Sequence, residues 1–231
     1  MKLTFLGHAG FRIEIGDQIL LVDPWVTGNP MFPVERRGEA IAGATAVLVT
    51  HGHFDHVNDA PAIAKELGIP VVTIFDLAGW LEKRDGVETM GFNKGGTVTL
   101  GDVAVTMVNA THSSALSDDD GRPVYTGTEA GFMIAHGGRT IYVSGDTDVM
   151  ADMKVFNDLH APEIGILCAG GHFTMDMARA AYAAKTFFDF KTVIPCHYGT
   201  FPFLEQSAEK LIAELPGVNV VEPEVMQPME L

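Results

Sequence analysis

Short apolar runs separated by polar turns open the chain. Residues 3–6, 11–15 and 18–22 are such runs, and glycine-containing turns lie between them. Short β-prone runs with this punctuation are typical of neighbouring strands in a β-meander. The pattern predicts that the chain begins as antiparallel sheet.

Residues 23–43 lack a regular alternation of apolar and polar positions. Prolines interrupt the segment repeatedly, and its apolar residues include Trp25, Met31 and Phe32. Loops of about 20 residues are uncommon inside compact domains and usually have a function. We expect a long loop here, acting as a lid over a site or as a contact with a second copy of the chain.

The rest of the chain alternates between strand-like and helix-like patterns. Strands are predicted over residues 46–50, 71–73, 97–100, 103–109, 132–135, 140–144, 164–169 and 192–195. Helical spacing predicts helices over residues 60–67, 77–83 and 204–215. Hairpins and strand–helix units in both halves indicate an α/β fold, a four-layer αββα sandwich of two mixed β-sheets. We expect residues 1–231 to form a single domain.

Composition narrows the classes of function. Asp and Glu number 30 against 15 Lys and Arg, and a formal charge of -15 disfavours long nucleic acids as partners. The N-terminal residues lack the apolar core of a signal peptide, and no apolar run is long enough to span a membrane. We therefore expect a cytoplasmic protein.

Cys168 and Cys196 each end a predicted strand and are expected to be reduced and buried.

The segment HGHFDH, directly after the strand predicted at 46–50, carries the strongest chemical signal. It places His51, His53, Asp55 and His56 within six residues. Imidazole and carboxylate together suit Zn, Mn, Fe or Ni, and the absence of neighbouring thiolates disfavours a structural zinc knot. One short loop cannot bring all four side chains to a single ion with good geometry. Two ions, or further ligands from elsewhere, are expected.

Three more potential ligands each follow a predicted strand. They are His112, Asp146 and His197. Polar residues at several strand ends can converge on one edge of a sandwich, which is how a metal site gathers ligands from distant sequence. Two other histidines, His136 and His160, are expected at the surface, and the acidic residues 118–120 are expected to form a solvated turn.

The order of these residues resembles the metallo-β-lactamase superfamily over nearly the whole chain. HGHFDH is followed by His112, by Asp146 after Ser-Gly, and by His197. Finer motifs are similar to a branch of uncharacterised metal-dependent hydrolases related to L-ascorbate-6-phosphate lactonase. These motifs are LGHAGF at 6–11, Asp-Pro at 23–24, GHFTM at 171–175 and PCHY at 195–198.

The resemblance implies the metallo-β-lactamase fold and a site for two divalent ions, with zinc foremost and manganese, iron or nickel as alternatives. It implies that one ion is held by His51, His53 and His112, the second by Asp55, His56 and His197, and that Asp146 bridges them. The implied reaction is hydrolysis by a metal-bound hydroxide of a small-molecule lactone, ester, amide or phosphodiester.

Four residues are candidates for catalytic roles beside the ions. Asp55 is expected to orient the nucleophile and to take its proton. His8, His172 and Tyr198 lie beside the strand-end motifs, where each either donates a hydrogen bond to substrate or supports the ligands and the packing.

Three other functions stay open. They are a phosphodiesterase or nuclease acting on short nucleic acids, a mononuclear iron oxygenase acting on thiols, and a binding module without catalysis. The charge of -15 disfavours the nuclease. A complete ligand set disfavours the other two, and the number of bound ions would separate the oxygenase from the hydrolase.

Overall fold

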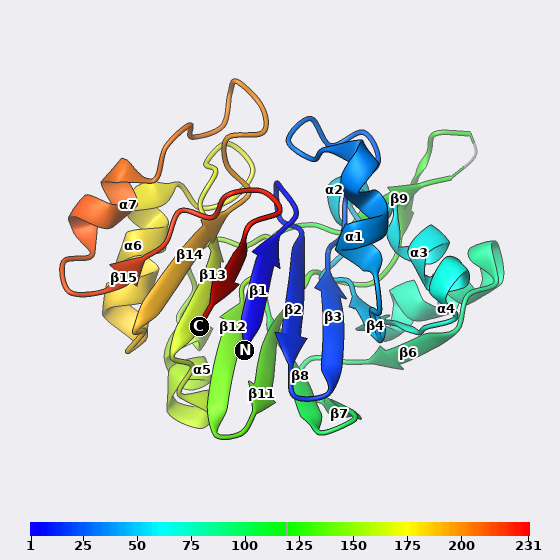
Figure 1. Ribbon diagram of the computed structural model, residues 1–231, viewed down its shortest axis with the longest axis horizontal. Coiled ribbons are helices and arrows are strands. Elements are labelled where there is room, and N and C mark those ends of the chain that lie inside the picture. Colours follow the sequence, from blue (N-terminus) through cyan, green and yellow to red (C-terminus); the bar gives the residue numbers. More distant parts are fainter. Residues whose placement is uncertain (119) are drawn as a thin grey trace.

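Two seven-stranded sheets dominate the computed structural model, which describes residues 1–118 and 120–231 (Figure 1). In spatial order, the first sheet contains β16 (Pro228–Glu230), β1 (Lys2–Phe5), β2 (Phe11–Ile15), β3 (Gln18–Val22), β4 (Ala46–Leu48), β5 (Val71–Ile74) and β6 (Thr89–Phe92). The second contains β15 (Asn219–Val220), β14 (Thr192–Cys196), β13 (Ile164–Cys168), β12 (Arg139–Val143), β11 (Ala130–His136), β8 (Val103–Asn109) and β7 (Thr97–Leu100). A small hairpin pairs β9 (Ala115–Ser117) with β10 (Pro123–Tyr125).

Both sheets are mixed. In the first, β1, β2 and β3 are antiparallel neighbours, as the meander pattern predicts, and β3 to β6 are parallel. In the second, β7, β8, β11 and β12 pair antiparallel, whereas β12 to β15 pair parallel. Each sheet thus joins a hairpin region to a strand–helix region, and the two halves share this plan.

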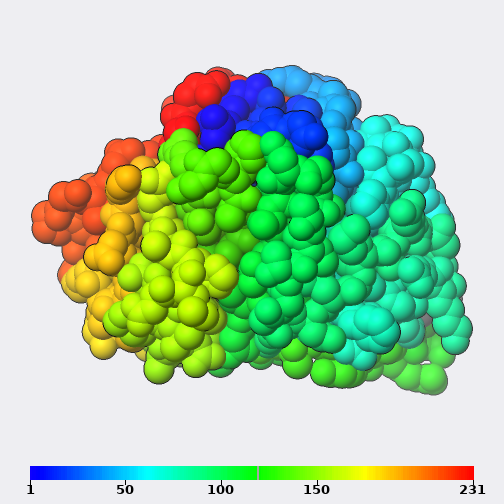
Figure 2. Space-filling model, turned by 90° about the horizontal axis from the view of Figure 1, so that it is seen from below, coloured from blue at the N-terminus to red at the C-terminus, as the bar shows by residue number. Residues whose placement is uncertain are grey.

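The helices lie outside the paired sheets. They are α1 (Arg37–Ile41), α2 (Phe54–Val57), α3 (Ala60–Leu67), α4 (Phe75–Asp85), α5 (Asp152–His160), α6 (Met177–Phe187) and α7 (Glu209–Glu214), with a short 3-10 turn, η1 (Val34–Arg36). Figure 1 shows α3 and α4 beside β4 to β6, and α6 and α7 beside β13 to β15. Figure 2, seen from below, shows the blue atoms of the N-terminal residues next to the green atoms of the middle of the chain.

One apolar core joins the two sheets. Leu3 and Ile13 of the first sheet belong to the same buried cluster as Phe132 and Ile141 of the second. In β2 the alternation of buried and half-buried residues turns every second side chain toward this core. The predicted αββα class is confirmed, whereas a single domain over residues 1–231 stays a prediction.

The prediction of a wholly irregular loop over 23–43 is wrong in its second half, where η1 and α1 form. The guanidinium of Arg12 donates to the carbonyl oxygens of Ala40 (3.2 Å) and Ala42 (2.6 Å), and so ties α1 to β2. A five-residue helix is too short to show a 3.6-residue period, and such helices depend on tertiary contacts. The first half is irregular, and Asp59 accepts hydrogen bonds from the backbone N–H groups of Val26 and Thr27 (both 2.8 Å).

The helix predicted over 204–215 is shorter than expected, because α7 covers only Glu209–Glu214. The side-chain amide of Gln206 donates to the carbonyl oxygens of Phe201 (2.9 Å) and Leu204 (2.7 Å). These local bonds satisfy the backbone in a non-helical conformation. Leu204 and Ala208 are buried as their spacing suggests, but the chain reaches these positions without a continuous helix.

Smaller expectations have mixed outcomes. Cys168 and Cys196 are free and buried, as expected. His136 and His160 are half-buried rather than fully exposed. The side chain of Asp118 caps a turn by accepting from backbone N–H groups, whereas Asp119 lies outside the described residues. Among the helices of the described residues, none is long and apolar enough to cross a membrane.

Tyr142 offers a test of the core. Its ring is fully buried against Phe156 and Phe188, and its hydroxyl has no hydrogen-bond partner among the described residues. Burying an unpaired hydroxyl costs about 1–3 kcal/mol. We expect Tyr142→Phe to leave the free energy of unfolding unchanged or to raise it by about 1 kcal/mol, measured by urea denaturation. A loss above about 1 kcal/mol would show that this hydroxyl is paired.

Candidate metal centre

The strand ends of both sheets meet at one edge of the sandwich, and the predicted ligands lie there. His51 and His53 follow β4, and Asp55 and His56 lie on α2, whose first residue is Phe54. The second sheet contributes side chains that follow β8, β12 and β14, which are those of His112, Asp146 and His197. Convergence is expected because neighbouring strand ends share an edge.

The first group of donor atoms surrounds the ring of His53. Its Nδ1 lies 3.0 Å from Nε2 of His51 and 3.3 Å from Nε2 of His112. Oδ2 of Asp146 lies 3.9 Å from Nε2 of His51 and 3.6 Å from Nε2 of His112. The three imidazole nitrogens therefore lie close together, and the carboxylate oxygen borders two of them, those of His51 and His112.

The second group shares the same carboxylate oxygen. Oδ2 of Asp146 lies 3.4 Å from Nε2 of His56 and 3.0 Å from Nε2 of His197. Oδ2 of Asp55 lies 3.9 Å from the same nitrogen of His56 and 3.7 Å from that of His197. The two groups therefore meet at Asp146. Three sets of side chains have atoms close enough together to hold a metal ion, which are His51, His53 and His112; His51, His56 and Asp146; and Asp55, His56 and His197 with His8.

Unpaired buried atoms show that these side chains suit cations. His56 is fully buried, yet its Nε2 has no hydrogen-bond partner among the described residues, and the same holds for Oδ1 of Asp146. Buried polar atoms are normally paired, so unpaired donors that face one another are typical of a metal site. Nitrogen and oxygen donors in this ratio fit divalent zinc, manganese, iron or nickel.

The electrostatics keep Asp146 ionised. Burial by itself would raise the pKa of Asp146, but the imidazoles of His197 and His56 hold that pKa well below its usual value. Burial lowers the pKa of His51 well below its ordinary value. At His56 and His197 burial is outweighed by the charge of Asp146 and other nearby carboxylates, which raises the pKa, well above its usual value for His56 and to about 9 for His197. A metal ion would therefore displace protons from these two imidazoles on binding.

Asp23 orients His56, and this role was missed from the sequence. Its Oδ2 accepts from Nδ1 of His56 (2.8 Å) and from Oγ1 of Thr50 (2.7 Å), while Oδ1 accepts from the backbone N–H of Thr50 (2.8 Å). A proton held on Nδ1 leaves Nε2 of His56 free to face Asp146. Asp23 also directly follows a predicted strand, which is the signal that identified the ligands and could have identified it.

Asp23→Asn should therefore weaken metal binding without removing a proposed ligand. The amide cannot accept all three hydrogen bonds in the same way, so the ring of His56 is held less firmly. We expect metal affinity to fall about 10- to 100-fold, measured by competition with a chromophoric chelator. The exposed Asp158→Asn is the matched control, and an equal loss in both variants would contradict this role for Asp23.

His8 lies behind the cluster rather than in the cavity. It is fully buried, its Nε2 lies 2.9 Å from Oδ2 of Asp55, and its Nδ1 lies 2.8 Å from Oγ1 of Thr200. Burial lowers the pKa of His8 to about 4, although Asp55 opposes this shift. The geometry therefore gives His8 a contact with Asp55 and does not place it on the cavity wall.

His172 and Tyr198 also lie off the wall. His172 is exposed, and its ring is 4.5 Å from that of Phe173, the residue that does line the cavity. Tyr198 is half-buried, and burial raises its pKa to about 12. Contact of either residue with substrate stays a prediction.

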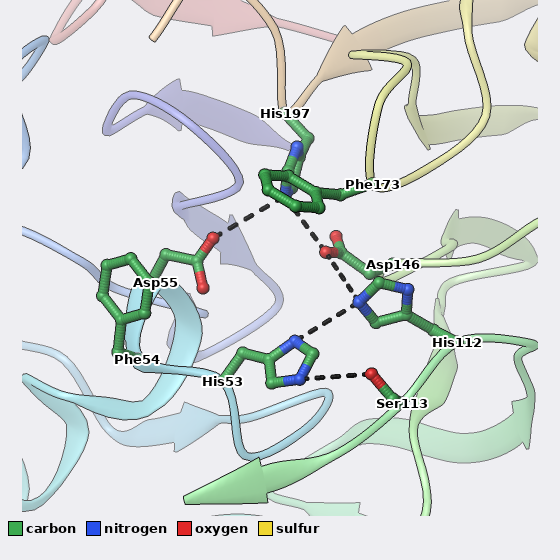
Figure 3. Close-up of a pocket in the computed structure, with 8 residues that line it drawn as sticks. All are labelled: His53, Phe54, Asp55, His112, Ser113, Asp146, Phe173 and His197. Atoms are coloured by element: carbon green, nitrogen blue, oxygen red, sulfur yellow. Dashed lines mark hydrogen bonds and ion pairs between the residues drawn. The ribbon is translucent and has the colours of Figure 1, made fainter. Parts of the chain in front are cut away.

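A cavity of about 350 Å³ opens over the donor atoms (Figure 3). Its walls are His53, Phe54, Asp55, His112, Ser113, Asp146, Phe173 and His197. The sequence did not single out Phe54, Ser113 or Phe173. Oγ of Ser113 lies 3.4 Å from Nε2 of His53, so it can orient that ring from the cavity side.

Comparison with known proteins agrees with this geometry. A family model described as the beta-lactamase superfamily domain matches residues 18–198, a span that contains all the predicted metal ligands. The chain belongs to the beta-lactamase superfamily. The expected metallo-β-lactamase resemblance is confirmed at this level, and so is the expectation of a metal-dependent hydrolase.

Several relatives match the chain over its whole length. A protein of Dinoroseobacter shibae named UPF0173 metal-dependent hydrolase is 70% identical over 231 residues, covering 100% of both chains. A protein of Paracoccus denitrificans with the same name is 64% identical, also over 100% of both chains. Among solved structures, the metallo hydrolase Igni18 of Ignicoccus hospitalis is 29% identical with a TM-score of 0.85, covering 100% of this chain and 98% of the other.

Proposed function

We propose that the cluster holds two divalent cations, zinc foremost, and that the enzyme hydrolyses a small molecule at a carbonyl or phosphoryl centre. In this proposal His51, His53 and His112 bind one ion, Asp55, His56 and His197 bind the other, and Asp146 bridges them. The observation that carries the proposal is Oδ2 of Asp146, which lies within 3.9 Å of imidazole nitrogens from both groups.

Such cations supply a hydroxide nucleophile near neutral pH and polarise the substrate oxygen. The chain's own residues then determine geometry and proton handling. Asp55 reaches the cavity wall while His8 holds its Oδ2 from behind, so this carboxylate is fixed where it can orient the attacking oxygen and accept its proton. Phe54 and Phe173 reduce the access of water to the reacting centre.

Metal removal tests this function directly. We expect a strong chelator to abolish hydrolysis, and reconstitution should restore it at about two ions per chain, counted by elemental analysis. Activity is to be screened on a lactone, an ester, an amide and a phosphodiester with Zn, Mn, Fe and Ni in turn. One iron per chain with oxygen consumption on thiols would instead support the oxygenase, and turnover that survives full metal removal would contradict the proposal.

We further propose that this single-domain enzyme acts on a small-molecule substrate in the cytoplasm and binds neither long nucleic acids nor membranes. The charge of -15 supports the exclusion of polyanions. Two further proposals are a role for residues 23–43 as a homo-oligomeric contact or a lid, and a family relation to lactonases of sugar phosphates that does not extend to their charged substrates. Sedimentation analysis would test the first, and the substrate screen would test the second.

A further inference from the structure

Five aromatic side chains form a continuous rim beside the cavity. They are Trp25, Phe54, Phe173, Phe201 and Phe203, here called the aromatic rim. Trp25 contacts Phe54 with ring centroids 5.6 Å apart, and Phe201 lies 6.2 Å from Trp25. Phe203 stacks on Phe201 at 5.5 Å and meets Phe173 edge-on at 5.8 Å.

The rim connects two walls of the cavity through residues that come from distant parts of the chain. Phe54 begins α2, Trp25 follows β3, Phe173 follows β13, and Phe201 and Phe203 follow β14. In Figure 3, Phe54 lies on the side of Asp55 and Phe173 on the side of His197. Apolar rings therefore flank the donor atoms on both sides.

Much of this apolar surface is accessible to water. Phe54, Phe173 and Phe203 are each 54–55% exposed, whereas Trp25 is 5% exposed and anchors the array from below. Single exposed apolar residues are ordinary, but a connected group beside a cavity typically marks a binding site. The exposed rings gain from burial only when an apolar group covers them.

The described side chains of the cavity wall include no Lys or Arg that could bind an anionic substrate arm. The two carboxylates among these cavity residues are those of Asp55 and Asp146. Two arginines border neighbouring hollows. Both are already paired, Arg84 with Asp85 at 2.7 Å and Arg179 with Asp148 through two bonds of 2.7 and 2.6 Å.

We infer that the enzyme selects uncharged substrates whose scissile group carries an alkyl or aryl arm, and that the aromatic rim binds this arm. The inference rests on the proposed hydrolysis and names its substrate class. Substrates with a phosphate or carboxylate on that arm are disfavoured, because the rim offers no cation to replace the water that such a group loses. Ions held by the donor atoms would polarise the reacting carbonyl while Phe54, Phe173 and Phe203 cover the arm.

A chain-length series tests the inference. The substrates are γ-butyrolactone and its γ-alkyl derivatives of increasing length, with a matched set ending in a carboxylate. Burial of each methylene contributes about 0.8 kcal/mol, so kcat/KM should rise about two- to fourfold per carbon until the rim is covered. The carboxylate set should lie about tenfold or more below the alkyl set. A flat series, or a preference for the charged arm, would overturn the inference.

Two variants assign the effect to the rim. Phe173→Ala and Phe203→Ala should each flatten the dependence on chain length, because they remove exposed rings that the arm covers. Phe75→Ala on α4 is the matched control, since Phe75 is also exposed, at 64%, but lies outside the rim. If kcat/KM rises equally with chain length in all three variants, the role of the rim is contradicted. Circular dichroism would verify that each variant is folded.

A binding measurement separates failure of the inference from failure of the proposed function. 2-Alkylcyclopentanones have a similar ring and carbonyl but no ester bond, and calorimetric titration measures their affinity for the metal-loaded protein without turnover. Affinity that rises with chain length and falls in Phe203→Ala supports the rim even if no lactone is hydrolysed, an outcome that would count against the proposed reaction alone. Affinity that is independent of chain length overturns the inference even if lactones are hydrolysed.

Discussion

Asp146→Ala is expected to remove both ions and to lower turnover by at least about 100-fold. The reason is geometric, because Oδ2 of Asp146 lies within 3.9 Å of imidazole nitrogens of His51, His56, His112 and His197. Loss of a supporting residue around a metal typically costs 10- to 100-fold in affinity or activity, and loss of a bridging ligand should cost more. Metal content by elemental analysis and kcat/KM on the best substrate of the screen measure the two effects.

The neighbouring Asp148 provides the control. Asp148→Asn changes a carboxylate two residues away that pairs with Arg179 at 46% exposure and does not line the cavity. An exposed pair of this kind contributes little, so its loss should leave metal content intact. Retention of two ions and of full turnover by Asp146→Ala would refute the bridging role.

Gly170→Ala should have the largest effect on folding. A Cβ atom at Gly170 would lie 1.8 Å from the carbonyl oxygen of His197, and this oxygen belongs to the backbone, so no side-chain rotation can relieve the contact. The ends of β13 and β14 must then separate, although the N–H of Ala169 donates to the carbonyl of Cys196 at 3.0 Å. We expect a loss of about 3 kcal/mol or more in the free energy of unfolding, or insoluble protein.

Gly79→Ala is the matched control with the opposite sign. A Cβ atom at Gly79 would meet nothing within 4 Å, and the residue lies inside α4. Alanine in a helix interior is favoured over glycine by about 0.5–1 kcal/mol. Urea denaturation should therefore show a large loss in the free energy of unfolding for Gly170→Ala and a small gain for Gly79→Ala. A soluble Gly170→Ala protein of unchanged stability would contradict the close approach of these strands.

The sequence predicted those parts of the fold that are encoded locally. The alternation in β2 and the HGHFDH segment after β4 are local patterns, so the sandwich was predicted correctly, and the structure brings the expected donor residues together. Helix α1 and strand β6 were missed, because the first is too short for a visible period and the second has only half-buried and exposed residues. Both depend on contacts with distant segments.

The clustering of the expected ligands could be predicted from the sequence, but the surroundings of the cluster could not. His112, Asp146 and His197 follow strands, and strand order brings them together. Asp23 follows a predicted strand as the ligands do, but its hydrogen bond joins it to His56, 33 positions away, and that partner could not be read from the sequence. The same is true of the aromatic rim, whose members come from four separate segments of the chain. It is also true of the cavity wall, which contains Phe173 and not its neighbour His172.

The donor atoms belong to both halves of the sandwich, since His51 follows a strand of the first sheet and His112 and His197 follow strands of the second. Cations bound between them would join the two halves of the sandwich at one edge. Unfolding must then release the ions, so their binding free energy adds to the stability of the whole chain. The melting temperature should therefore rise with the fraction of metal sites that are filled. Removal of metal by a chelator should increase local unfolding first at the edge where the two halves meet.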